Sequence, residues 1–405
     1  MKVLHVLPSL SARIGGPAIS VVESALALRA CGVESTIFAT DMAEAVSAKR
    51  RRRVMPADLP AGADQLDVRL FAARWPYRLA FAPLMQRALD EAAPRYDVVH
   101  IHMLFMYPQF AAYRAARRYG VPYIVSPCGA LDPHLRTRSR LAKALTDHAW
   151  QRDMLDGAAA LHFKTSEEAA LVADLGLRAP AVVAPNGVRC DGFGALPSGE
   201  AFRARYLGGH GGPVVLNLGR LSHKKGLDVL ARAFAIVASR HPDAMLVLAG
   251  PDDEDLTPSL RVLSRQLGID ARVRFTGMLR GDDKLGALAA SGVWALPSHT
   301  ENFGVAVVEA MAVGLPVVIS PQVNIAREIA EAGAGIVCER TPEAFAAQII
   351  ALLDDASTRV SLGGRARAFA RRYDWSEVAP QLARMYASVA GRTEAEAAKE
   401  MAHAA

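Results

Sequence analysis

Residues 298–320 read SHTENFGVAVVEAMAVGLPVVIS, and the rest of the chain can be interpreted around them. An apolar run at 293–296 precedes this stretch and predicts a buried strand. Residues 305–313 predict a helix, which Gly314 ends, and residues 317–319 predict a second buried strand. This succession of strand, loop, helix and strand is typical of a parallel α/β fold.

Two carboxylates fall within this stretch, Glu301 on the loop and Glu309 early on the helix. The loop and the helix N-terminus meet the carboxyl edge of the sheet, where open α/β folds bind ligands. Backbone N–H groups and the helix dipole at that edge suit a phosphate, whereas carboxylates accept hydrogen bonds from neutral hydroxyls. A phosphate together with vicinal hydroxyls describes a nucleotide. The alternative is that both glutamates are solvated surface charges.

Residues 301–318 follow the pattern E-N-F-G-x-x-x-x-E-A-M-A-x-G-x-P-V-V. The pattern resembles the E-x7-E signature of the family 4 glycosyltransferases, which are retaining enzymes with the two-domain GT-B architecture. Two glutamates at this spacing are unspecific by themselves, but the residues around them make the resemblance specific. The resemblance implies that Glu301 holds the hydroxyls of the donor sugar and that Glu309 holds the ribose hydroxyls. It adds three donor-binding candidates beside Glu301: Asn302, Phe303 and Gly304.

A basic loop, GRLSHKKG at 219–226, follows the apolar strand predicted at 214–218. Its cations and the free backbone donors of the next helix predict an anion site. In the resembled family, the arginine and a lysine of G-R-x-x-x-x-K-G bind the donor diphosphate, and the matching residues are Arg220 and Lys225. We assign these two residues and Glu301 to catalysis, because cations stabilise the charge on the departing nucleoside diphosphate. The family also places base contacts at Gly277 and Met278.

The length of 405 residues favours two domains. A Pro-Asn-Gly-Val turn at 185–188 predicts the boundary between them. The resemblance implies an α/β protein of GT-B fold, with two Rossmann-like α/β/α domains facing a central cleft. Residues 1–187 would bind the acceptor and residues 188–374 the nucleotide-sugar donor. A last helix at 375–390 would cross back to the first domain, and residues 391–405 predict a flexible tail.

Two glycines follow the first predicted strand, in the loop SARIGGP. Gly15 and Gly16 allow the backbone to approach a ligand closely. The loop lacks the G-x-G-x-x-G fingerprint, which disfavours a dinucleotide-dependent oxidoreductase. In the resembled family such a pair faces the donor diphosphate, so we assign both glycines to donor binding; a simple strand-to-helix turn is the alternative.

Acceptor-side candidates follow two later strands: His102, Cys128 and His134. Cys128 stands where related enzymes often carry a histidine near the donor sugar. We expect His100 and His102 to lie on opposite faces of their strand and so not to share a metal. The acidic run at 252–255 is interpreted as a polar turn. Since GT-B enzymes typically need no divalent metal, we predict no metal site and no cofactor beyond the nucleotide-sugar substrate.

The net charge of +6 is confined to the first half of the chain. Residues 1–188 contain 23 basic and 17 acidic residues, which leaves 24 of each in the remainder. The basic run Lys49, Arg50, Arg51, Arg52 and Arg53 shares this half with Trp75 and Tyr77, and such a mixture favours an anionic membrane or a charged lipid-linked acceptor. A solvated loop is the alternative. No recognisable motif supports binding of nucleic acid.

The sequence favours a cytoplasmic location. No apolar run approaches the roughly 20 residues that cross a bilayer, and the N-terminal MKVLHVLPSL is a poor signal peptide. The four cysteines are scattered, as is typical of reduced thiols. A peripheral position at the inner face of the membrane is compatible with the basic run.

The predicted reaction moves a hexose from a GDP- or UDP-linked donor to a hydroxyl of a glycan or lipid-linked acceptor, with retention of configuration. Mannose or glucose transfer in exopolysaccharide or lipopolysaccharide synthesis is favoured, because the similarity is to bacterial enzymes of surface polysaccharides. The alternatives are a nucleotide-sugar epimerase on the same fold, a dinucleotide-dependent oxidoreductase and a non-catalytic binding module.

Overall fold

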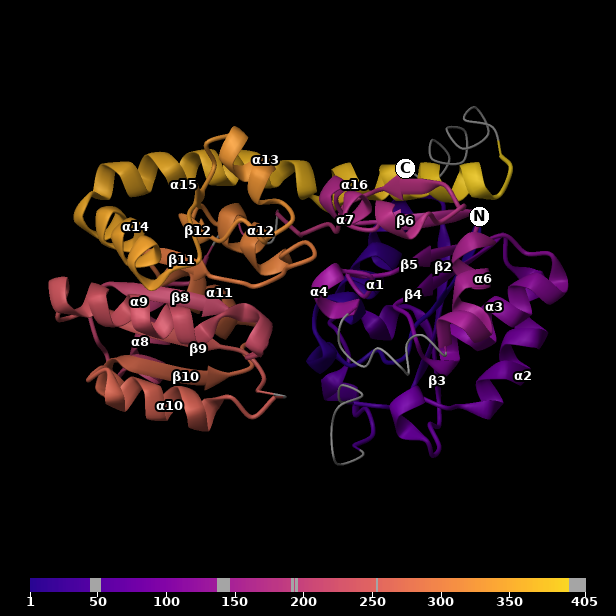
Figure 1. Ribbon diagram of the computed structural model, residues 1–405, viewed down its shortest axis with the longest axis horizontal. Helices are drawn as coiled ribbons and strands as arrows, with labels where there is room; N and C mark the ends of the chain where they lie inside the picture. The colour runs from indigo at the N-terminus through magenta and orange to yellow at the C-terminus, as the bar shows by residue number, and fades with distance from the viewer. Residues whose placement is uncertain (44–51, 137–145, 191–192, 194–195, 253, 393–405) are drawn as a thin grey trace. The chain divides into compact units, whose positions relative to one another are not determined.

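The computed structural model divides the chain into two compact units, shown in Figure 1. Unit 1 comprises Met1–Gly187 and Trp375–Ala405, and unit 2 comprises Val188–Asp374. The division falls at the predicted Pro-Asn-Gly-Val turn and again just before the last helix. The structure describes residues 1–43, 52–136, 146–190, 193, 196–252 and 254–392.

Unit 1 contains a seven-stranded parallel sheet in the order β3-β2-β1-β4-β5-β6-β7. The order reverses between β1 and β4, and open α/β sheets bind their ligands at the carboxyl ends of such a pair. The strands are β1 (Lys2–Val6), β2 (Glu34–Thr40), β3 (Asp67–Phe71), β4 (Val98–His102), β5 (Tyr123–Ser126), β6 (Ala160–Phe163) and β7 (Ala181–Val183).

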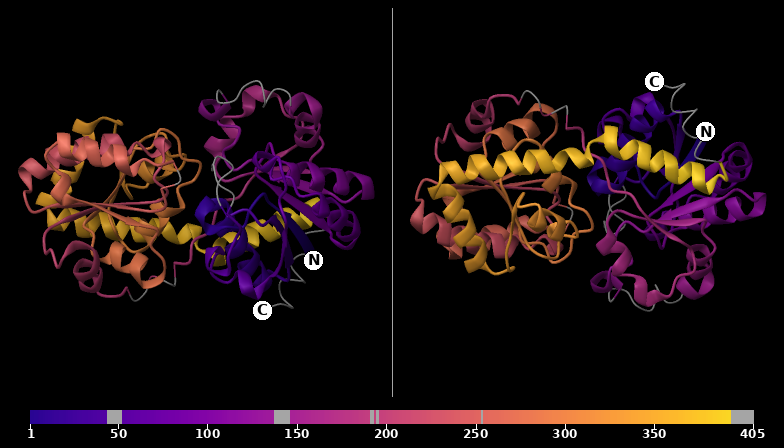
Figure 2. Two further views of the ribbon diagram at one scale, coloured as in Figure 1. Left: turned by 90° about the horizontal axis from the view of Figure 1, so that it is seen from below. Right: turned by 90° about the horizontal axis from the view of Figure 1, so that it is seen from above.

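Helices cover both faces of this sheet (Figure 2). Successive residues of a strand point to opposite faces. Val3 accordingly packs in a cluster with α16 (Trp375–Val389), and Ile37 packs with α1 (Gly16–Ala27). Leu4 and Phe38 pack on the other face with α2 (Pro83–Ala92) and α3 (Tyr107–Tyr119). The shorter helices are α4 (Pro133–Arg136), α6 (Arg152–Asp156) and α7 (Ser166–Ala170).

Unit 2 repeats this plan with six parallel strands in the order β10-β9-β8-β11-β12-β13. The order reverses between β8 and β11, which places a second potential ligand crevice at their carboxyl ends. The strands are β8 (Val214–Leu218), β9 (Met245–Ala249), β10 (Val273–Gly277), β11 (Val293–Leu296), β12 (Val317–Ile319) and β13 (Ile336–Val337).

The two faces of the second sheet carry separate cores. Val215 packs with α9 (Leu227–Arg240), α10 (Thr257–Gln266) and α14 (Pro342–Asp354). Val214 and Leu216 pack on the other side, with α8, α11, α12, α13 and α15. Those five helices span Gly199–Leu207, Gly281–Ala289, Val305–Ala312, Ala326–Glu331 and Ala356–Ala370.

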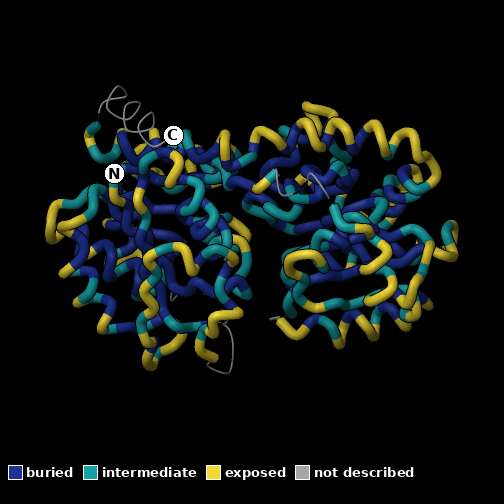
Figure 3. The backbone as a smooth tube through the Cα atoms, turned by 180° about the vertical axis from the view of Figure 1, so that it is seen from behind, coloured by how far each residue is buried: buried dark blue, intermediate teal, exposed yellow. Residues whose placement is uncertain are grey.

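Burial follows this layering in each unit. The inner strands of each sheet form the buried centre and the outer faces of the helices are exposed, as Figure 3 shows. None of the helices in the described part of the chain is both long enough and apolar enough to span a bilayer.

Candidate active site

The site of unit 2 begins where the loops after β8 and β11 meet. The Ser298 hydroxyl and the His299 backbone N–H both donate to the Lys224 carbonyl, at 2.8 and 2.7 Å. Gly226 has a φ of 63°, and a Cβ at this position would lie 2.1 Å from the Pro297 carbonyl oxygen. Only glycine permits this close approach, which fixes the basic loop against the glutamate loop.

Glu301 lies at the centre of a cluster of cations. The ammonium of Lys225 forms an ion pair with its carboxylate, and that of Lys224 lies 4.0 Å from the same oxygen. Burial would raise the pKa of Glu301, but the charges of Lys224, Lys225 and Arg220 outweigh burial and lower it to about 2. The structure therefore brings together the three residues assigned to catalysis, Glu301, Arg220 and Lys225, and keeps the carboxylate ionised.

The pKa of Lys224 indicates an excess of positive charge at this site. Glu301 raises its pKa, yet burial and the neighbouring cations Lys225 and Arg220 lower it overall. Three cations thus surround one carboxylate, and the remaining positive charge suits an anionic ligand.

The backbone holds Glu301 in place from a second side. Its N–H donates to the Gln322 carbonyl at 3.0 Å, and its carbonyl accepts from Asn324 N–H at 2.9 Å. Gly304 then turns the chain into α12 with a φ of 84°, and a Cβ there would lie 3.0 Å from Val307. The orientation of the loop is therefore set by its surroundings, as a binding site requires.

Glu309 has a partner that the sequence did not suggest. Lys284 on α11 donates to its carboxylate at 2.6 Å, and both side chains are largely buried. The contact joins two helices across 25 residues, so no local spacing predicts it. Glu309 is therefore paired with a cation near the middle of α12.

Phe303 is not available to a ligand in the way the sequence suggested. Its ring is buried in the core and packs edge-to-face on Tyr373, with 5.2 Å between the ring centroids. The ring therefore belongs to the core, and the backbone of Phe303 remains the candidate for donor contact. Asn302 beside it is partly exposed.

Gly277 ends β10 with a φ of 72° and has open space where a side chain would be. The guanidinium of Arg280 donates to the sulfur of Met278 at 3.3 Å. The loop is thus accessible at the carboxyl edge of the sheet.

The acidic run at 252–255 has structural roles in its described residues. The Asp252 carboxylate accepts from the backbone N–H groups of Leu256 and Thr257, at 2.8 and 2.7 Å, and so caps α10. Glu254 accepts from the N–H of His223 at 2.9 Å. These contacts agree with the interpretation as a polar turn, and Asp253 lies outside the described residues.

In unit 1, Gly15 and Gly16 lie at the start of α1. Gly15 has a φ of 92°, in the region that favours glycine, and no atom lies within 4 Å of a Cβ built at Gly16. The N-terminus of this 12-residue helix is therefore open to a ligand.

Cys128 follows β5 with a φ of 53°, and burial raises the pKa of its thiol to about 11. The thiol is therefore protonated at neutral pH and is neither a nucleophile nor a base. The buried carboxylate of Glu168 orders this loop, accepting from the N–H groups of Gly129 and Lys164 at 2.7 Å each. His134 is exposed on α4, away from the buried histidines described next.

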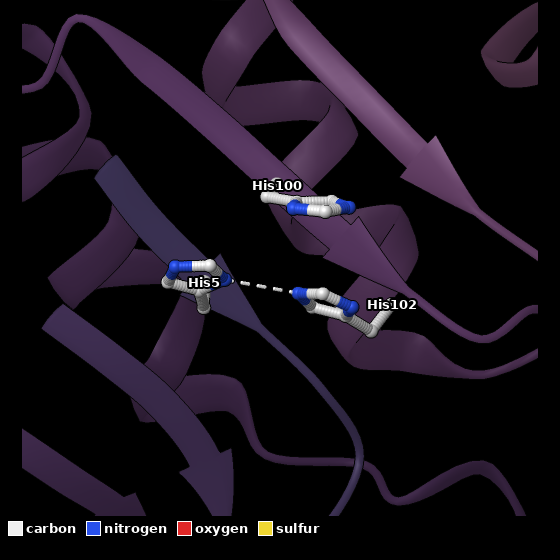
Figure 4. A group of neighbouring side chains, drawn as sticks. All are labelled: His5, His100 and His102. Carbon is white, nitrogen blue, oxygen red and sulfur yellow. Dashed lines mark hydrogen bonds between the residues drawn. The ribbon is translucent and has the colours of Figure 1, made fainter. Parts of the chain in front are cut away.

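Four buried histidines form a layer on the face of the sheet that α16 covers: His5, His100, His102 and His162. Figure 4 shows the first three, from β1 and β4. The rings of His100 and His102 have centroids 4.0 Å apart, so the expectation that they point to opposite faces was wrong. Residues two apart on a strand share a face, because the side-chain period is two.

Hydrogen bonds connect this histidine layer. His5 Nδ1 lies 3.0 Å from His102 Nε2, and His100 Nδ1 lies 2.8 Å from the Tyr386 hydroxyl of α16. Burial lowers the pKa of every imidazole in the layer, and for His5 the pKa falls to about 3.

Three of these imidazoles could in principle ligate one cation, since ring nitrogens of His5, His100 and His102 lie within 4.8 Å of one another. Two observations oppose a cation. The closest pair of nitrogens is already hydrogen-bonded, and the ammonium of Lys164 lies 3.2 Å from the ring nitrogens of His162 and lowers the pKa of the whole layer. The layer is better described as a neutral hydrogen-bonded core.

The described end of the basic run is ion-paired. Arg52 contacts the buried carboxylate of Asp58 at 3.2 Å, and Arg53 contacts Asp41 at 3.3 Å. These two charges are partly neutralised within unit 1. The remaining candidates for membrane contact, Lys49, Arg50 and Arg51, lie outside the described residues.

Comparisons with known proteins cover both units. Residues 15–187 match the model of a glycosyl transferase 4-like domain, and residues 200–369 match the glycosyl transferases of group 1. A D-inositol 3-phosphate glycosyltransferase of Corynebacterium glutamicum is 33% identical over 178 residues, 43% of this chain and 43% of that protein. The chain therefore spans less than half of the length of that relative.

A second relative matches residues of both units. A phosphatidyl-myo-inositol mannosyltransferase of Mycolicibacterium smegmatis is 29% identical over 333 residues, 78% of this chain and 77% of that protein. Among solved structures, Anabaena HepE in complex with UDP-glucose aligns with a TM-score of 0.75 at 22% identity, over 96% of this chain and all of that one. WaaG, a glycosyltransferase involved in lipopolysaccharide biosynthesis, gives 0.68 at 17% identity, over 96% and 100%. These structures share the fold of this chain.

Proposed function

Because the chain belongs to the family 4 glycosyltransferases of GT-B fold, we propose that it transfers a sugar from a nucleoside-diphosphate sugar to an acceptor hydroxyl with retention of configuration. The observation that carries the proposal is the cluster in which Arg220, Lys224 and Lys225 surround the ionised carboxylate of Glu301 at the switch point of unit 2.

The charges of this cluster fit the reaction. In the free protein, Lys225 is paired with Glu301; a bound donor diphosphate would take Lys225 and Arg220 as its partners. Glu301 would then accept from hydroxyls of the donor sugar, and Glu309 from the ribose. The cations stabilise the negative charge that develops on the leaving diphosphate.

Bond exchange is proposed to occur on one face of the sugar. The acceptor oxygen bonds to the anomeric carbon as the bond from that carbon to the diphosphate oxygen breaks. The acceptor proton passes to an oxygen of the departing diphosphate. Neither glutamate acts as the covalent nucleophile of a retaining glycosidase, and the proposal uses no metal.

The finer specificity rests on the relatives. We propose a hexose donor linked to GDP or UDP, of the mannose or glucose type, and an acceptor that is a glycan or a lipid-linked glycan in exopolysaccharide or lipopolysaccharide synthesis. The names of the mannosyltransferase relative, HepE and WaaG support these classes. We place the protein in the cytoplasm, peripheral to the membrane that supplies such an acceptor.

A thermal-shift screen of GDP- and UDP-sugars tests the proposal. A ligand at a hundred times its Kd should stabilise the fold by about 2.7 kcal/mol, and the stabilising donor should then support transfer with retained anomeric configuration by NMR. The proposal would be refuted if no nucleotide sugar stabilised the protein while a nicotinamide dinucleotide did. An epimerase would instead convert the donor with no acceptor present, so incubation with donor alone separates the two activities.

A further inference from the structure

A loop of unit 1 exposes apolar side chains beside unpaired arginines. Residues 75–80 lie in the connection between β3 and α2, and the Arg74 N–H donates to the Phe81 carbonyl at 2.6 Å to close the loop. Trp75 is 79% exposed and Leu79 is 46% exposed, whereas the large apolar side chains of the core are almost inaccessible. Exposed aromatic and aliphatic groups gathered on one loop are a mark of an interaction site.

The same surface extends to two neighbouring segments. Leu84, in the first turn of α2, is 58% exposed, and Met55 is 54% exposed. Asp41 links the segments, because its carboxylate accepts from the Ala73 N–H at 2.8 Å and pairs with Arg53 at 3.3 Å. The loop, the end of the basic run and Met55 are therefore held at one edge of the sheet.

The charge of this surface is positive. Arg74 and Arg78 are exposed and have no carboxylate partner among the described residues, while Arg52 and Arg53 are paired with Asp58 and Asp41. The unpaired arginines flank the tryptophan within one loop. Tryptophan and arginine side by side suit the headgroup region of a bilayer, where the ring meets the acyl boundary and the guanidinium meets lipid phosphate.

The position of the loop in the sheet is also compatible with a membrane contact. All strands of the sheet are parallel, so the loop after β3 emerges at the same edge as the loops after β4 and β5 that carry the acceptor-side candidates. A bilayer at the loop would therefore present a lipid-linked acceptor to the edge where this domain would use it.

From this combination, we infer that the surface made of Arg74, Trp75, Arg78, Leu79, Leu84 and Met55 docks on an anionic lipid bilayer, with Trp75 inserted at the interface. The inference deepens the proposed function, since it names the source of the acceptor. It narrows the membrane contact predicted from the sequence, which combined the basic run with Trp75 and Tyr77. The apolar loop supplies the anchor, and Arg52 and Arg53 serve mainly to hold the surface together.

Binding to vesicles of phosphatidylglycerol, with phosphatidylcholine vesicles as the neutral comparison, tests the inference. The full chain should float with phosphatidylglycerol and much less with phosphatidylcholine. Raising the ionic strength from roughly 0.1 M to roughly 1 M should weaken binding, because the Debye length falls from about 10 Å to about 3 Å. Trp75 emission should shift to the blue and be quenched by brominated lipid, a signal that Trp75→Phe removes while binding persists.

Variants separate the contribution of the arginine charges to vesicle binding from that of the apolar side chains. The pair Arg74→Ser and Arg78→Ser should weaken partitioning about 30-fold, since each cation contributes about 1 kcal/mol near an anionic surface. Trp75→Ala should weaken it by roughly 10- to 100-fold. The matched controls lie on unit 2: Arg232→Ser with Arg265→Ser for charge, and Val360→Ala, which is 76% exposed in the native protein, for apolar surface. These controls should bind vesicles as the native chain does.

Two outcomes would overturn the inference: no binding of the native chain to phosphatidylglycerol at low salt, or equal losses in the loop variants and the unit 2 controls. The proposed function is judged separately, by donor-induced thermal stabilisation and by transfer to a soluble acceptor. A chain that transfers sugar normally but ignores vesicles refutes the docking surface alone. A chain that docks but binds no nucleotide sugar refutes the proposed function alone.

Discussion

Acidification should unfold unit 1 before unit 2, because below about pH 6.5 the imidazoles of the histidine layer stay neutral in the folded state and become protonated in the unfolded chain. Burial lowers the pKa of all four imidazoles, whereas in the unfolded chain each takes up a proton near pH 6.5. The unfolded state therefore binds more protons below that pH. Stability that is present above pH 6.5 is lost as the pH falls toward the folded-state pKa values.

The magnitude follows from the number of imidazoles. Each buried neutral histidine removes about 1.4 kcal/mol of stability per pH unit below pH 6.5. Between pH 7 and pH 5 the loss is about 2 kcal/mol for one histidine that stays neutral in the folded state, and it grows with each further histidine that does so. Domains are stable by about 5–15 kcal/mol, so the combined loss should bring unit 1 closer to unfolding at pH 5.

Hydrogen exchange of individual peptides, read at a series of pH values and corrected for intrinsic exchange, distinguishes the two units. Amides of β1 and β4 should lose protection steeply below pH 6.5, while those of β8 and β11 serve as the internal reference. His5→Gln should reduce the slope of the free energy of unfolding against pH, measured for unit 1, by about 1.4 kcal/mol per pH unit. A slope no larger than that of one histidine, or the same slope in both units, would refute the reasoning.

Three further predictions concern unit 2. Glu309→Ala should lower kcat/KM for the donor by an amount that corresponds to a loss of roughly 2–4 kcal/mol of transition-state stabilisation, while the helix content stays unchanged. A near-normal kcat/KM would contradict its role at the ribose. Activity should survive EDTA, because Arg220 and Lys225 supply the positive charge; loss restored by Mn²⁺ or Mg²⁺ would reopen the question of the acidic run. Phe303→Ala should cost about 3–5 kcal/mol of folding stability and leave donor affinity intact at temperatures where the variant is folded, whereas a selective loss of affinity would show that the ring does contact the ligand.

Much of the architecture could be predicted, and the family and the fold class are confirmed. Strands β8 and β11 coincide with the predicted 214–218 and 293–296. These strands are central and buried on both faces, so they read as continuous apolar runs ended by glycine or proline. The basic loop and the glutamate loop follow such strands, which is why their meeting at the carboxyl edge could be expected.

The edge of the first sheet could not be predicted in the same way. β3 (Asp67–Phe71) has exposed or half-exposed residues along its whole length, because it is the outermost strand and pairs on one side only. Its sequence, DVRLF, contains neither a continuous apolar run nor a clean alternation. The position of this strand is set by pairing with β2, a contact across some thirty residues that propensity does not describe.

The same limit applies to the side-chain contacts that give each unit its chemistry. The Lys284–Glu309 pair depends on how α11 and α12 pack, and the histidine layer depends on the register that places His5 opposite His100. Both are long-range contacts between residues that are ordinary in their own segments. Phe303 shows the converse, since a motif residue next to a functional glutamate supports the core.

The two switch points differ in their electrostatics, and from this difference we expect them to bind different substrates. In unit 2 burial, followed by the neighbouring cations Lys225 and Arg220, lowers the pKa of Lys224 at the carboxyl edge, so an arriving dianion would relieve repulsion among these cations. In unit 1 the described groups below the edge include neutral imidazoles and a protonated thiol, and the one ammonium beside them, Lys164, is accompanied by the buried carboxylate of Glu168. We therefore expect a nucleoside diphosphate to bind at unit 2 and a neutral hydroxyl acceptor to bind at unit 1. Mild acid should abolish acceptor binding by unit 1 before donor binding by unit 2. Protonation destabilises the histidine layer of unit 1, while Glu301 of unit 2, with a pKa of about 2, stays ionised.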